Sequence, residues 1–326
     1  MARTPPLGGG PYLSAVVPVY DEVDCLPAFH AELAAALEEL GRAAEIVYVD
    51  DGSTDGSTDL LHKLQLERPD LVRVVVLRRN FRKSGALAAG FAMARGALLC
   101  TLDADGQDAP SGIGRLLALI EGDGYDLVGG WRRTRADRLA KRWTSRWYNA
   151  VTRSLTGLPL HDFNTGLKLM RREVAEELPL YGEFHRFLPV LAHDLGFKVG
   201  EVAVVHRRRP AGRSKYRSPL RFPNTMLDLL TVVFLTRFSD RPLHLLGGLG
   251  AALSTAGFAV LAYLSGLKLL TGARIGSRPL LTLGMLTLLV GVQMIGIGFI
   301  GDVLRHTSAR DRQPYRIREV FDAAGE

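Results

Sequence analysis

The stretch ALLCTLDADGQD, residues 97–108, carries Asp103, Asp105 and Asp108 directly behind an apolar run. The apolar part, residues 97–102, predicts a buried strand. Carboxylates crowded at a strand's end raise one another's pKa unless a cation lies among them. Mg²⁺ and Mn²⁺ suit such a place, because these ions take one or two carboxylates and complete their shell with water and substrate phosphates. An isolated Asp-x-Asp pair more often caps a helix or lines a loop, so a metal and diphosphate site depends on the rest of the chain.

Three strand–helix units precede this stretch. Strands are predicted at residues 13–19, 45–49 and 72–77. Helices are predicted at about residues 26–40, after residue 55, and at about residues 84–95. Four successive units predict an α/β, doubly wound, mostly parallel sheet with ligands at the carboxyl ends of its strands. The acidic clusters at 20–22, 50–55 and 103–108 all fall at such ends. Turn and N-cap chemistry explains one cluster, but it is a weaker explanation for three at one edge.

Two other nucleotide-binding folds share this architecture. A dinucleotide-binding domain needs a glycine-rich turn behind the first strand. Here that turn is PVYDE, residues 18–22, and Gly8, Gly9 and Gly10 lie before the strand. The P-loop pattern G-x-x-x-x-G-K-[ST] does not occur in the sequence. Both interpretations are therefore excluded.

The chain carries eight motifs in a fixed order: VVPVYDE (16–22), VDDGSTD (49–55), RRNFRKSGALAAG (78–90), DADGQD (103–108), GGWR (129–132), HDFNTGLKLMRR (161–172), HRF (185–187) and RPAGRSKY (209–216). This set resembles the family-2 glycosyltransferases of the GT-A fold, and within them the polyprenyl-phosphate glycosyltransferases of the dolichyl-phosphate mannose synthase group. Two departures from the family pattern occur: Asp21 replaces the usual Asn, and Gly106 with Ala109-Pro110-Ser111 replaces the usual Leu and Pro-Pro-Glu. Neither removes an expected metal ligand.

The resemblance implies a set of site residues. The donor nucleotide sugar is expected at Pro18, Tyr20, Glu22, Val49, Asp51, Asp103, Ala104 and Arg132. A Mg²⁺ or Mn²⁺ cofactor is expected at Asp103, Asp105 and Gln107. The catalytic group is expected to comprise Asp105, Asp162, Arg209 and Lys215. The acceptor phosphate and lipid side is expected to comprise Arg142, His185, Arg186, Arg213 and Ser214.

Asp162 matches the residue proposed in relatives as the catalytic base. A phosphate acceptor is already ionised near neutral pH, so deprotonation contributes little to its reactivity. Two alternatives stay open: Asp162 orients the acceptor, or it is purely structural.

Two basic segments suit phosphate and lipid headgroups. A helix at about residues 138–155 interleaves Lys and Arg with Trp143 and Trp147, which beside membrane segments fits a lipid surface better than nucleic acid. The run HRRRPAGRSKY, residues 206–216, concentrates positive charge around Gly and Ser. It is interpreted as a loop that folds over phosphates, and the alternative is a solvated charge run.

Composition leaves room for a large core and is typical of a cytosolic domain. The chain has 326 residues, 47% hydrophobic content and a net charge of +7. Its two cysteines, Cys25 and Cys100, give no disulfide framework, as expected in the cytosol. The start of the chain has no signal-peptide pattern and is expected to be disordered.

Two uncharged stretches, residues 245–267 and 279–301, are each long enough to span a hydrocarbon core of about 30 Å. Residues 223–238 suit an interfacial helix, and the alternation at 315–320 suits a strand that pairs with a sheet edge. The positive-inside rule places both termini in the cytoplasm, although Lys268, Arg274 and Arg278 in the connecting loop oppose it. The expected division is a disordered start at 1–11, a catalytic domain at 12–218, interfacial helices at 219–242, spans at 243–267 and 279–302, an external loop at 268–278 and a cytoplasmic tail at 303–326.

By resemblance, the expected activity is inverting transfer of one hexose from a nucleotide sugar, of the UDP-glucose or GDP-mannose type, to undecaprenyl or dolichyl phosphate. The product would serve as a lipid-linked donor for later glycosylation. Expected partners are the nucleotide sugar, polyprenyl phosphate, membrane lipid and further copies of the chain, with no nucleic acid. A processive polysaccharide synthase is the alternative enzyme, although the Gln of its Gln-x-x-Arg-Trp motif is missing before Arg146-Trp147. A catalytically inactive membrane scaffold or sugar-nucleotide sensor is the alternative outside enzymes.

Overall fold

The computed structural model describes residues 10–133, 139–180, 182–207, 221–238, 242–272, 274, 276 and 279–308. The side chains of residues 139–146, 221–225, 237–238 and 305–308 lie outside the description. Arg209, Arg213, Ser214, Lys215 and the predicted tail strand at 315–320 fall outside the described residues, as does the side chain of Arg142. The chain forms two compact units, Met1–Val232 and Val233–Glu326.

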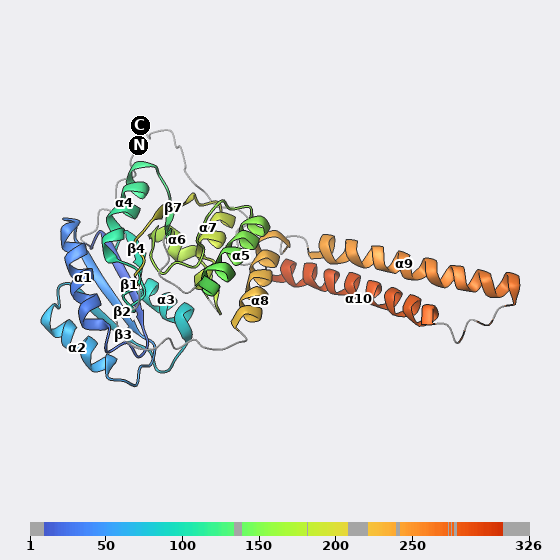
Figure 1. Ribbon diagram of the computed structural model, residues 1–326, viewed down its shortest axis with the longest axis horizontal. Coiled ribbons are helices and arrows are strands. Elements are labelled where there is room, and N and C mark those ends of the chain that lie inside the picture. The colour runs from blue at the N-terminus through green and yellow to red at the C-terminus, as the bar shows by residue number, and fades with distance from the viewer. Residues whose placement is uncertain are drawn as a thin grey trace, which may run out of the picture. The chain divides into compact units, whose positions relative to one another are not determined.

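The first unit is built on a seven-stranded sheet in the order β3-β2-β1-β4-β6-β5-β7 (Figure 1). Its strands are β1 (Leu13–Val19), β2 (Ala44–Asp50), β3 (Val72–Val76), β4 (Leu98–Thr101), β5 (Leu127–Trp131), β6 (Lys168–Arg171) and β7 (Val199–Ala203). The pairs β1–β2, β2–β3, β1–β4 and β5–β7 are parallel, whereas β6 is antiparallel to both of its neighbours, β4 and β5. The predicted mostly parallel sheet is therefore confirmed.

Helices cover both faces of the sheet (Figure 1). Alternate residues of β1, such as Leu13 and Val17, share one core with buried side chains of α1, α2 and α4. The opposite face carries Val16, against which α3 packs so closely that a Cβ added to Gly90 would overlap it. The helices of this unit are α1 (Leu26–Glu39), α2 (Ser57–Glu67), α3 (Arg82–Met93), η1 (Pro110–Gly112), α4 (Ile113–Gly122), α5 (Leu139–Thr156), α6 (Arg172–Glu177), η2 (Phe184–Arg186), α7 (Leu188–Asp194) and α8 (Arg221–Val233).

The predicted elements differ from the observed ones mainly at their ends. The strand predicted at 97–102 is shorter, Leu98–Thr101, and the helix predicted at about 84–95 begins earlier, at Arg82. Arg82 has φ 65°, in the left-handed region, and its N–H donates to Asn80 Oδ1 at 2.9 Å. The N-cap residue, Phe81, makes no side-chain cap, so the helix start has no capping signal in the sequence. The interfacial segment predicted at 223–238 is α8 followed by a π-helical turn, Phe234–Phe238.

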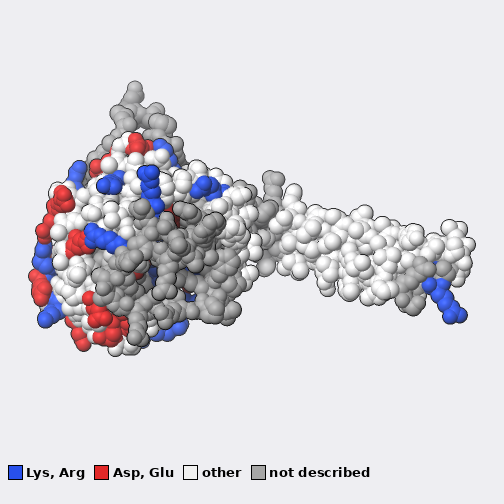
Figure 2. All heavy atoms as spheres, in the orientation of Figure 1, with Lys and Arg blue, Asp and Glu red and all other residues white. Residues whose placement is uncertain are grey.

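The second unit contains two long apolar helices, α9 (Pro242–Thr271) and α10 (Pro279–Ser308). Both are long and apolar enough to cross a membrane, with mean hydropathies of 1.8 and 2.1. They pack against each other through small residues: a Cβ added to Gly250 would lie 2.6 Å from the carbonyl oxygen of Gly291. Only 11% of each apolar window is buried, and Figure 2 shows their visible face free of charge along most of its length. A buried helix pair of a soluble core would not leave so much apolar surface exposed.

Candidate active site

The reversed direction of β6 brings two distant segments together at one edge of the sheet. Thr101, the last residue of β4, pairs with Lys168, the first residue of β6. The loop before β6 therefore lies beside the aspartates that follow β4. The hydroxyl of Thr101 donates to the carbonyl oxygen of Gly166 at 2.8 Å, which ties the two segments together.

Asp103 forms an ion pair with Lys83, in the first turn of α3. Lys83 is a site residue that the sequence analysis missed, although it lies inside the motif RRNFRKSGALAAG. A signal was present, because a lysine in the first turn of a helix opposes the helix dipole and is stabilised by a nearby anion. The pair places a protein cation next to the carboxylate expected to hold a metal.

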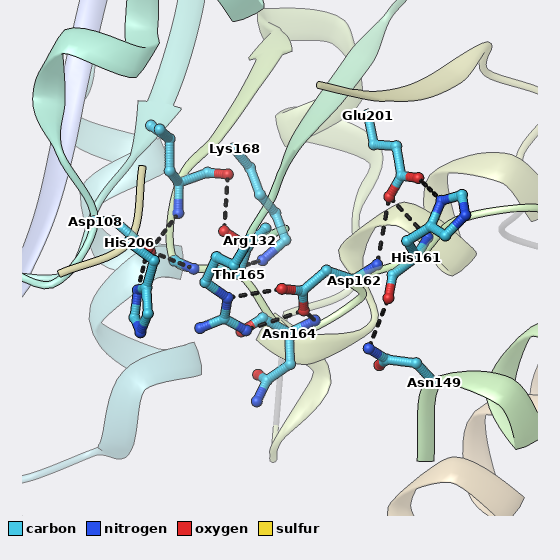
Figure 3. A network of polar contacts seen from close by, with 12 residues as sticks. Asp108, Arg132, Asn149, His161, Asp162, Asn164, Thr165, Lys168, Glu201 and His206 are labelled. Atoms are coloured by element: carbon cyan, nitrogen blue, oxygen red, sulfur yellow. Dashed lines mark hydrogen bonds and ion pairs between the residues drawn. The ribbon is translucent and has the colours of Figure 1, made fainter. Parts of the chain in front are cut away.

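Asp108 forms hydrogen bonds with the loop that precedes β6. Its Oδ2 accepts the N–H groups of Gly166 at 3.1 Å and Leu167 at 3.3 Å, and Oδ1 lies 3.1 Å from Nδ1 of His206 (Figure 3). Burial raises the pKa of Asp108, but the hydrogen bond from His206 and the charges of Arg132 and Lys83 outweigh burial, so its pKa lies below the ordinary value. Asp108 therefore serves as a structural carboxylate.

Gly166 has no space for a side chain. An added Cβ would lie 2.8 Å from the carboxylate carbon of Asp103 and 2.9 Å from Oδ2 of Asp108. The absence of a Cβ thus allows two aspartates to approach the backbone of this loop.

Arg132 and Asp162 form a bidentate ion pair. Nε and Nη2 of Arg132 donate to the two oxygens of Asp162 at 2.7 and 2.9 Å, and Nη2 also donates to the carbonyl oxygen of Asn164 at 2.8 Å. Their side chains are 13% and 3% exposed. Burial lowers the pKa of Arg132, but Asp162 outweighs it and the pKa lies above the ordinary value. Because both oxygens of Asp162 accept from Arg132, this geometry suits an orienting or a structural role better than that of a base, and the role stays a prediction.

Lys168 is a second site residue that the sequence analysis missed. It is buried at the start of β6, and its ammonium group donates to the carbonyl oxygen of Thr165. Burial lowers its pKa to about 7, with the charges of Lys83 and Arg132 adding to the effect and those of Asp103 and Asp162 opposing it. Lys168 therefore lies within electrostatic range of the expected metal ligand and of the expected base. Lys168 lies inside the motif HDFNTGLKLMRR, and a lysine within the apolar run LKLM was a further signal in the sequence.

The loops that follow β1 and β2 in the sequence form hydrogen bonds with each other. Asp21 Oδ1 accepts the N–H of Thr54 at 2.7 Å, and the N–H of Asp21 donates to Ser53 Oγ at 2.9 Å. Asp21 has φ 48°, a left-handed conformation that Asn and Asp adopt more readily than most residues. The exchange of Asn for Asp therefore preserves the loop.

Asp51 is buried, and its Oδ1 accepts the N–H of Phe81 at 2.6 Å. Burial, with a smaller contribution from Asp50, raises its pKa above the ordinary value. Asp51 thus orders the loop behind β3 from within the expected nucleotide site.

The remaining expected donor residues follow the same sheet edge. Tyr20 is exposed, and Pro18 and Glu22 are half-buried. Val49 and Ala104 are buried, at 0% and 3% exposed.

The expected metal ligands have oxygen donors of the kind that Mg²⁺ and Mn²⁺ prefer. Asp105 Oδ1 accepts the N–H of Gln107 at 3.1 Å, so these two residues lie together behind β4. Within the described ranges, no group of three or more His, Cys, Asp or Glu side chains is placed to hold a metal ion. Two aspartates fit an ion that takes the rest of its shell from a diphosphate and water.

His185 and Arg186 contact other parts of the protein. His185 is buried, and its Nδ1 lies 2.9 Å from Oγ of Ser84, with which it forms a hydrogen bond. Ser84 follows Lys83 in the sequence. Arg186 pairs with Glu183 at 2.7 Å and approaches Asp228 of α8 to 4.0 Å. The HRF motif thus links α3 to α8, and its acceptor role stays a prediction.

Comparison with known proteins gives a family match and full-length relatives. Residues 14–179 match the family model described as glycosyl transferase family 2. The chain is 36% identical over 315 residues to dodecaprenyl-phosphate galacturonate synthase of Rhizobium johnstonii, covering 95% of this chain and 93% of that protein. It is 38% identical over 314 residues to undecaprenyl-phosphate 4-deoxy-4-formamido-L-arabinose transferase of Pseudomonas aeruginosa, covering 95% of this chain and 91% of that protein.

Solved structures with the same architecture are more distant. Glucosyl-3-phosphoglycerate synthase of Mycobacterium tuberculosis in complex with UDP superimposes with a TM-score of 0.52 at 20% identity, covering 69% of this chain and 80% of that chain. A second structure of that enzyme, with Mn²⁺, UDP-glucose and phosphoglyceric acid, gives a TM-score of 0.51 at 19% identity, covering 70% of this chain and 80% of that chain. These likenesses concern the fold, and they agree with the predicted GT-A architecture.

Proposed function

Since the chain belongs to glycosyl transferase family 2, we propose that it transfers one sugar residue from a nucleotide sugar to polyprenyl phosphate. The observation that carries this proposal is the match to two polyprenyl-phosphate sugar transferases along 95% of the chain, including both apolar helices. Relatives matched only over the catalytic domain would have left the acceptor open.

The sugar is proposed to be a modified one. The names of the two relatives specify galacturonate and 4-deoxy-4-formamido-L-arabinose, so they give no support to the expected UDP-glucose or GDP-mannose. The acceptor phosphate attacks the anomeric carbon from the face opposite the leaving diphosphate, so that an α-linked donor gives a β-linked lipid product.

The donor is proposed to bind at the carboxyl ends of β1, β2 and β4. Asp103, Asp105 and Gln107 would hold a divalent cation, whose chemistry is to stabilise the negative charge that develops on the departing diphosphate. Lys83 adds a cation of the protein at the same place, because it pairs with Asp103. Lys83 and the cation would together offset negative charge of the diphosphate, while the carboxylates would hold the cation.

The acceptor phosphate is proposed to bind on the side of Asp162, whose ion pair with Arg132 links it to a residue expected at the donor. Their ion pair fixes the guanidinium within electrostatic range of Asp103 and Asp108. Arg209 and Lys215, which lie outside the described residues, are proposed to contact donor or acceptor phosphates, in line with the family motif.

The chain is proposed to lie in the cytoplasmic membrane with its catalytic domain in the cytoplasm. Two exposed leucines of α8, Leu227 and Leu230, are 61% and 52% exposed. They lie three residues apart on one helix face, as in a helix that rests on a membrane surface. This placement suits an acceptor whose tail stays in the bilayer while its phosphate lies at the surface.

A donor panel tests the proposed function. The purified chain in lipid nanodiscs is incubated with Mg²⁺ or Mn²⁺, undecaprenyl phosphate and nucleotide derivatives of galacturonate, 4-deoxy-4-formamido-L-arabinose, glucose and mannose. Mass spectrometry of the lipid fraction should detect one sugar residue per lipid with one of the first two donors. Formation of longer chains would instead indicate a processive synthase, and the absence of a sugar–lipid product with every donor would refute the enzyme proposal.

A further inference from the structure

Glu201, in the edge strand β7, contacts the loop that carries Asp162. Its Oε2 accepts the N–H of His161 at 2.8 Å and the N–H of Asp162 at 3.3 Å (Figure 3). Its Oε1 contacts Nδ1 of His161. One carboxylate therefore holds two consecutive backbone N–H groups and a ring nitrogen, directly behind the Asp162 side chain.

The same loop is held from its other side by α5 and β5. Asn149 donates from its side chain to the carbonyl oxygen of His161 at 2.7 Å, and Nε of Arg153 donates to that of Leu160 at 3.1 Å. The ring of His161 stacks on Trp131, with 4.4 Å between centroids and 23° between planes. Residues of three elements, α5, β5 and β7, thus contact the backbone or ring on either side of Asp162. Among these residues, Glu201 is the negatively charged one.

The position of Glu201 makes its loss costly. Its side chain is 12% exposed, so the charge is largely removed from water and depends on the donors that it faces. Without it, the N–H groups of His161 and Asp162 would lose their acceptor inside the protein. Hydrogen bonds to an ionised group are stronger than neutral ones, so this carboxylate restrains the loop more than an amide in its place would.

Asp162 depends on this restraint because its own contact is directional. The two bonds from Arg132 require the carboxylate plane to face the guanidinium, at 2.7 and 2.9 Å. Rotation of the backbone at His161 or Asp162 would turn the Asp162 carboxylate away from the two N–H groups of Arg132. Misplacement of a catalytic group by about 1 Å is enough to cost on the order of a hundredfold in rate.

We propose that Glu201 is a positioning residue, which holds the Asp162 loop so that Asp162 presents both oxygens to Arg132 at the acceptor side of the site. The inference rests on the proposed function for its effect on turnover. Its structural part, the restraint of the loop, is independent of the reaction.

The test compares Glu201→Ala and Glu201→Gln with Glu176→Ala in the full chain in nanodiscs. Glu176 is the matched control, because it is an exposed glutamate of α6 whose partner is Arg172, at 3.6 Å. Amide hydrogen exchange of a peptide covering residues 158–167 reports the loop directly. Acceptor turnover, acceptor KM and nucleotide affinity are measured in parallel, also in the Asp162→Asn background.

We expect Glu201→Ala to raise amide exchange at His161 and Asp162 at least about tenfold, and to lower kcat for polyprenyl phosphate by about 10- to 100-fold. Nucleotide affinity should change less than kcat, since Glu201 contacts the Asp162 loop and reaches the expected donor residue Arg132 only through Asp162. Glu201→Gln keeps an oxygen for both N–H groups and should show smaller changes of both kinds. In the Asp162→Asn background, Glu201→Ala should lower turnover by less than about twofold further.

Equal amide exchange in Glu201→Ala and Glu176→Ala would overturn the proposal. So would a loss of turnover by the same factor whether or not Asp162→Asn is present, because Glu201 would then act by another route. If Glu201→Ala does not fold, Glu201→Gln gives the same comparison with the shape of the side chain retained. Absence of a sugar–lipid product from the unchanged chain would refute the proposed function alone, and the exchange measurement would still decide the role of Glu201.

Discussion

Lys83 and Asp103 form an ion pair across the gap between the first turn of α3 and the end of β4. Their side chains are 26% and 36% exposed, so the ion pair is partly accessible to solvent. A lysine at a helix start is unfavourable by itself, and Asp103 offsets it. The same carboxylate is proposed to bind a divalent cation, so Lys83 and the metal compete for it.

Replacing Lys83 by Met should therefore tighten the binding of Mn²⁺ alone while lowering turnover, because the diphosphate loses a cation. A partly exposed ion pair is worth up to about 1 kcal/mol, which corresponds to about fivefold in metal affinity. Electron paramagnetic resonance of free Mn²⁺ measures this change. Lys83→Arg keeps the charge and is the control, and unchanged or weaker Mn²⁺ binding in Lys83→Met would rule out the competition.

Asp105→Ala should lower turnover by about a hundred- to a thousandfold and weaken donor binding, since the cation loses an anionic ligand. Sugar transfer and nucleotide affinity are measured with and without chelator. Asp59→Ala, in the exposed first turn of α2, is the matched control and should behave like the unchanged chain. Near-normal turnover of Asp105→Ala in the presence of chelator would show that the metal role is wrong.

Asp162→Ala and Arg132→Met should each destabilise the catalytic domain by about 3–5 kcal/mol, because each leaves a buried charge without its partner. The double variant should be less destabilised than either single variant, since both charges are then removed. Chemical unfolding of the full chain in detergent measures the three free energies. Additive losses would mean that the two residues do not act as a buried pair.

Lys168→Met should change how stability depends on pH. Lys168 has a pKa of about 7 in the folded protein, against an ordinary value of 10.5. Between these values the unfolded chain binds a proton that the folded chain does not, so Lys168 makes stability rise with pH. The slope approaches about 1.4 kcal/mol per pH unit and vanishes below about pH 7. Thermal unfolding between about pH 6 and 10 should show this rise in the unchanged chain and in Lys63→Met, an exposed control, but not in Lys168→Met.

The double variant Leu227→Glu with Leu230→Glu should lower turnover on long-chain polyprenyl phosphate in vesicles more than about tenfold. Turnover on a short, water-soluble acceptor should stay near normal, because α8 would hold the site at the membrane surface, where only a membrane-bound acceptor lies. Leu66→Glu is the control, since Leu66 is an exposed leucine of α2. Equal losses on both acceptors would assign α8 to folding instead of membrane contact.

Much of the fold could be predicted from local patterns. The apolar runs of β1 to β4, the polar clusters behind them and the two uncharged stretches each lie within a few residues of sequence, and their type follows from periodicity and length. The motif order further indicated the family, which the family model and the full-length relatives confirm. The roles of individual site residues stay predictions. Helix and strand ends were less accurate, as at Arg82, because the residue before that helix is not a side-chain cap that the sequence could have revealed.

The composition of the site was decided by tertiary structure. Because β6 runs against its neighbours, the loop before it reaches the edge where β4 ends, and Asp162, Gly166 and Lys168 join Asp103 there. Lys83 pairs with Asp103 from 20 residues away, and Glu201 holds the loop of Asp162 from 39. No local pattern contains such pairs, since strand direction and sheet order set them and these depend on the packing of the whole domain. The sequence by itself determined which helices and strands form and to which family the chain belongs. Which charged side chains lie together at the site depends on the order and direction of the strands, because these bring distant segments to one edge of the sheet.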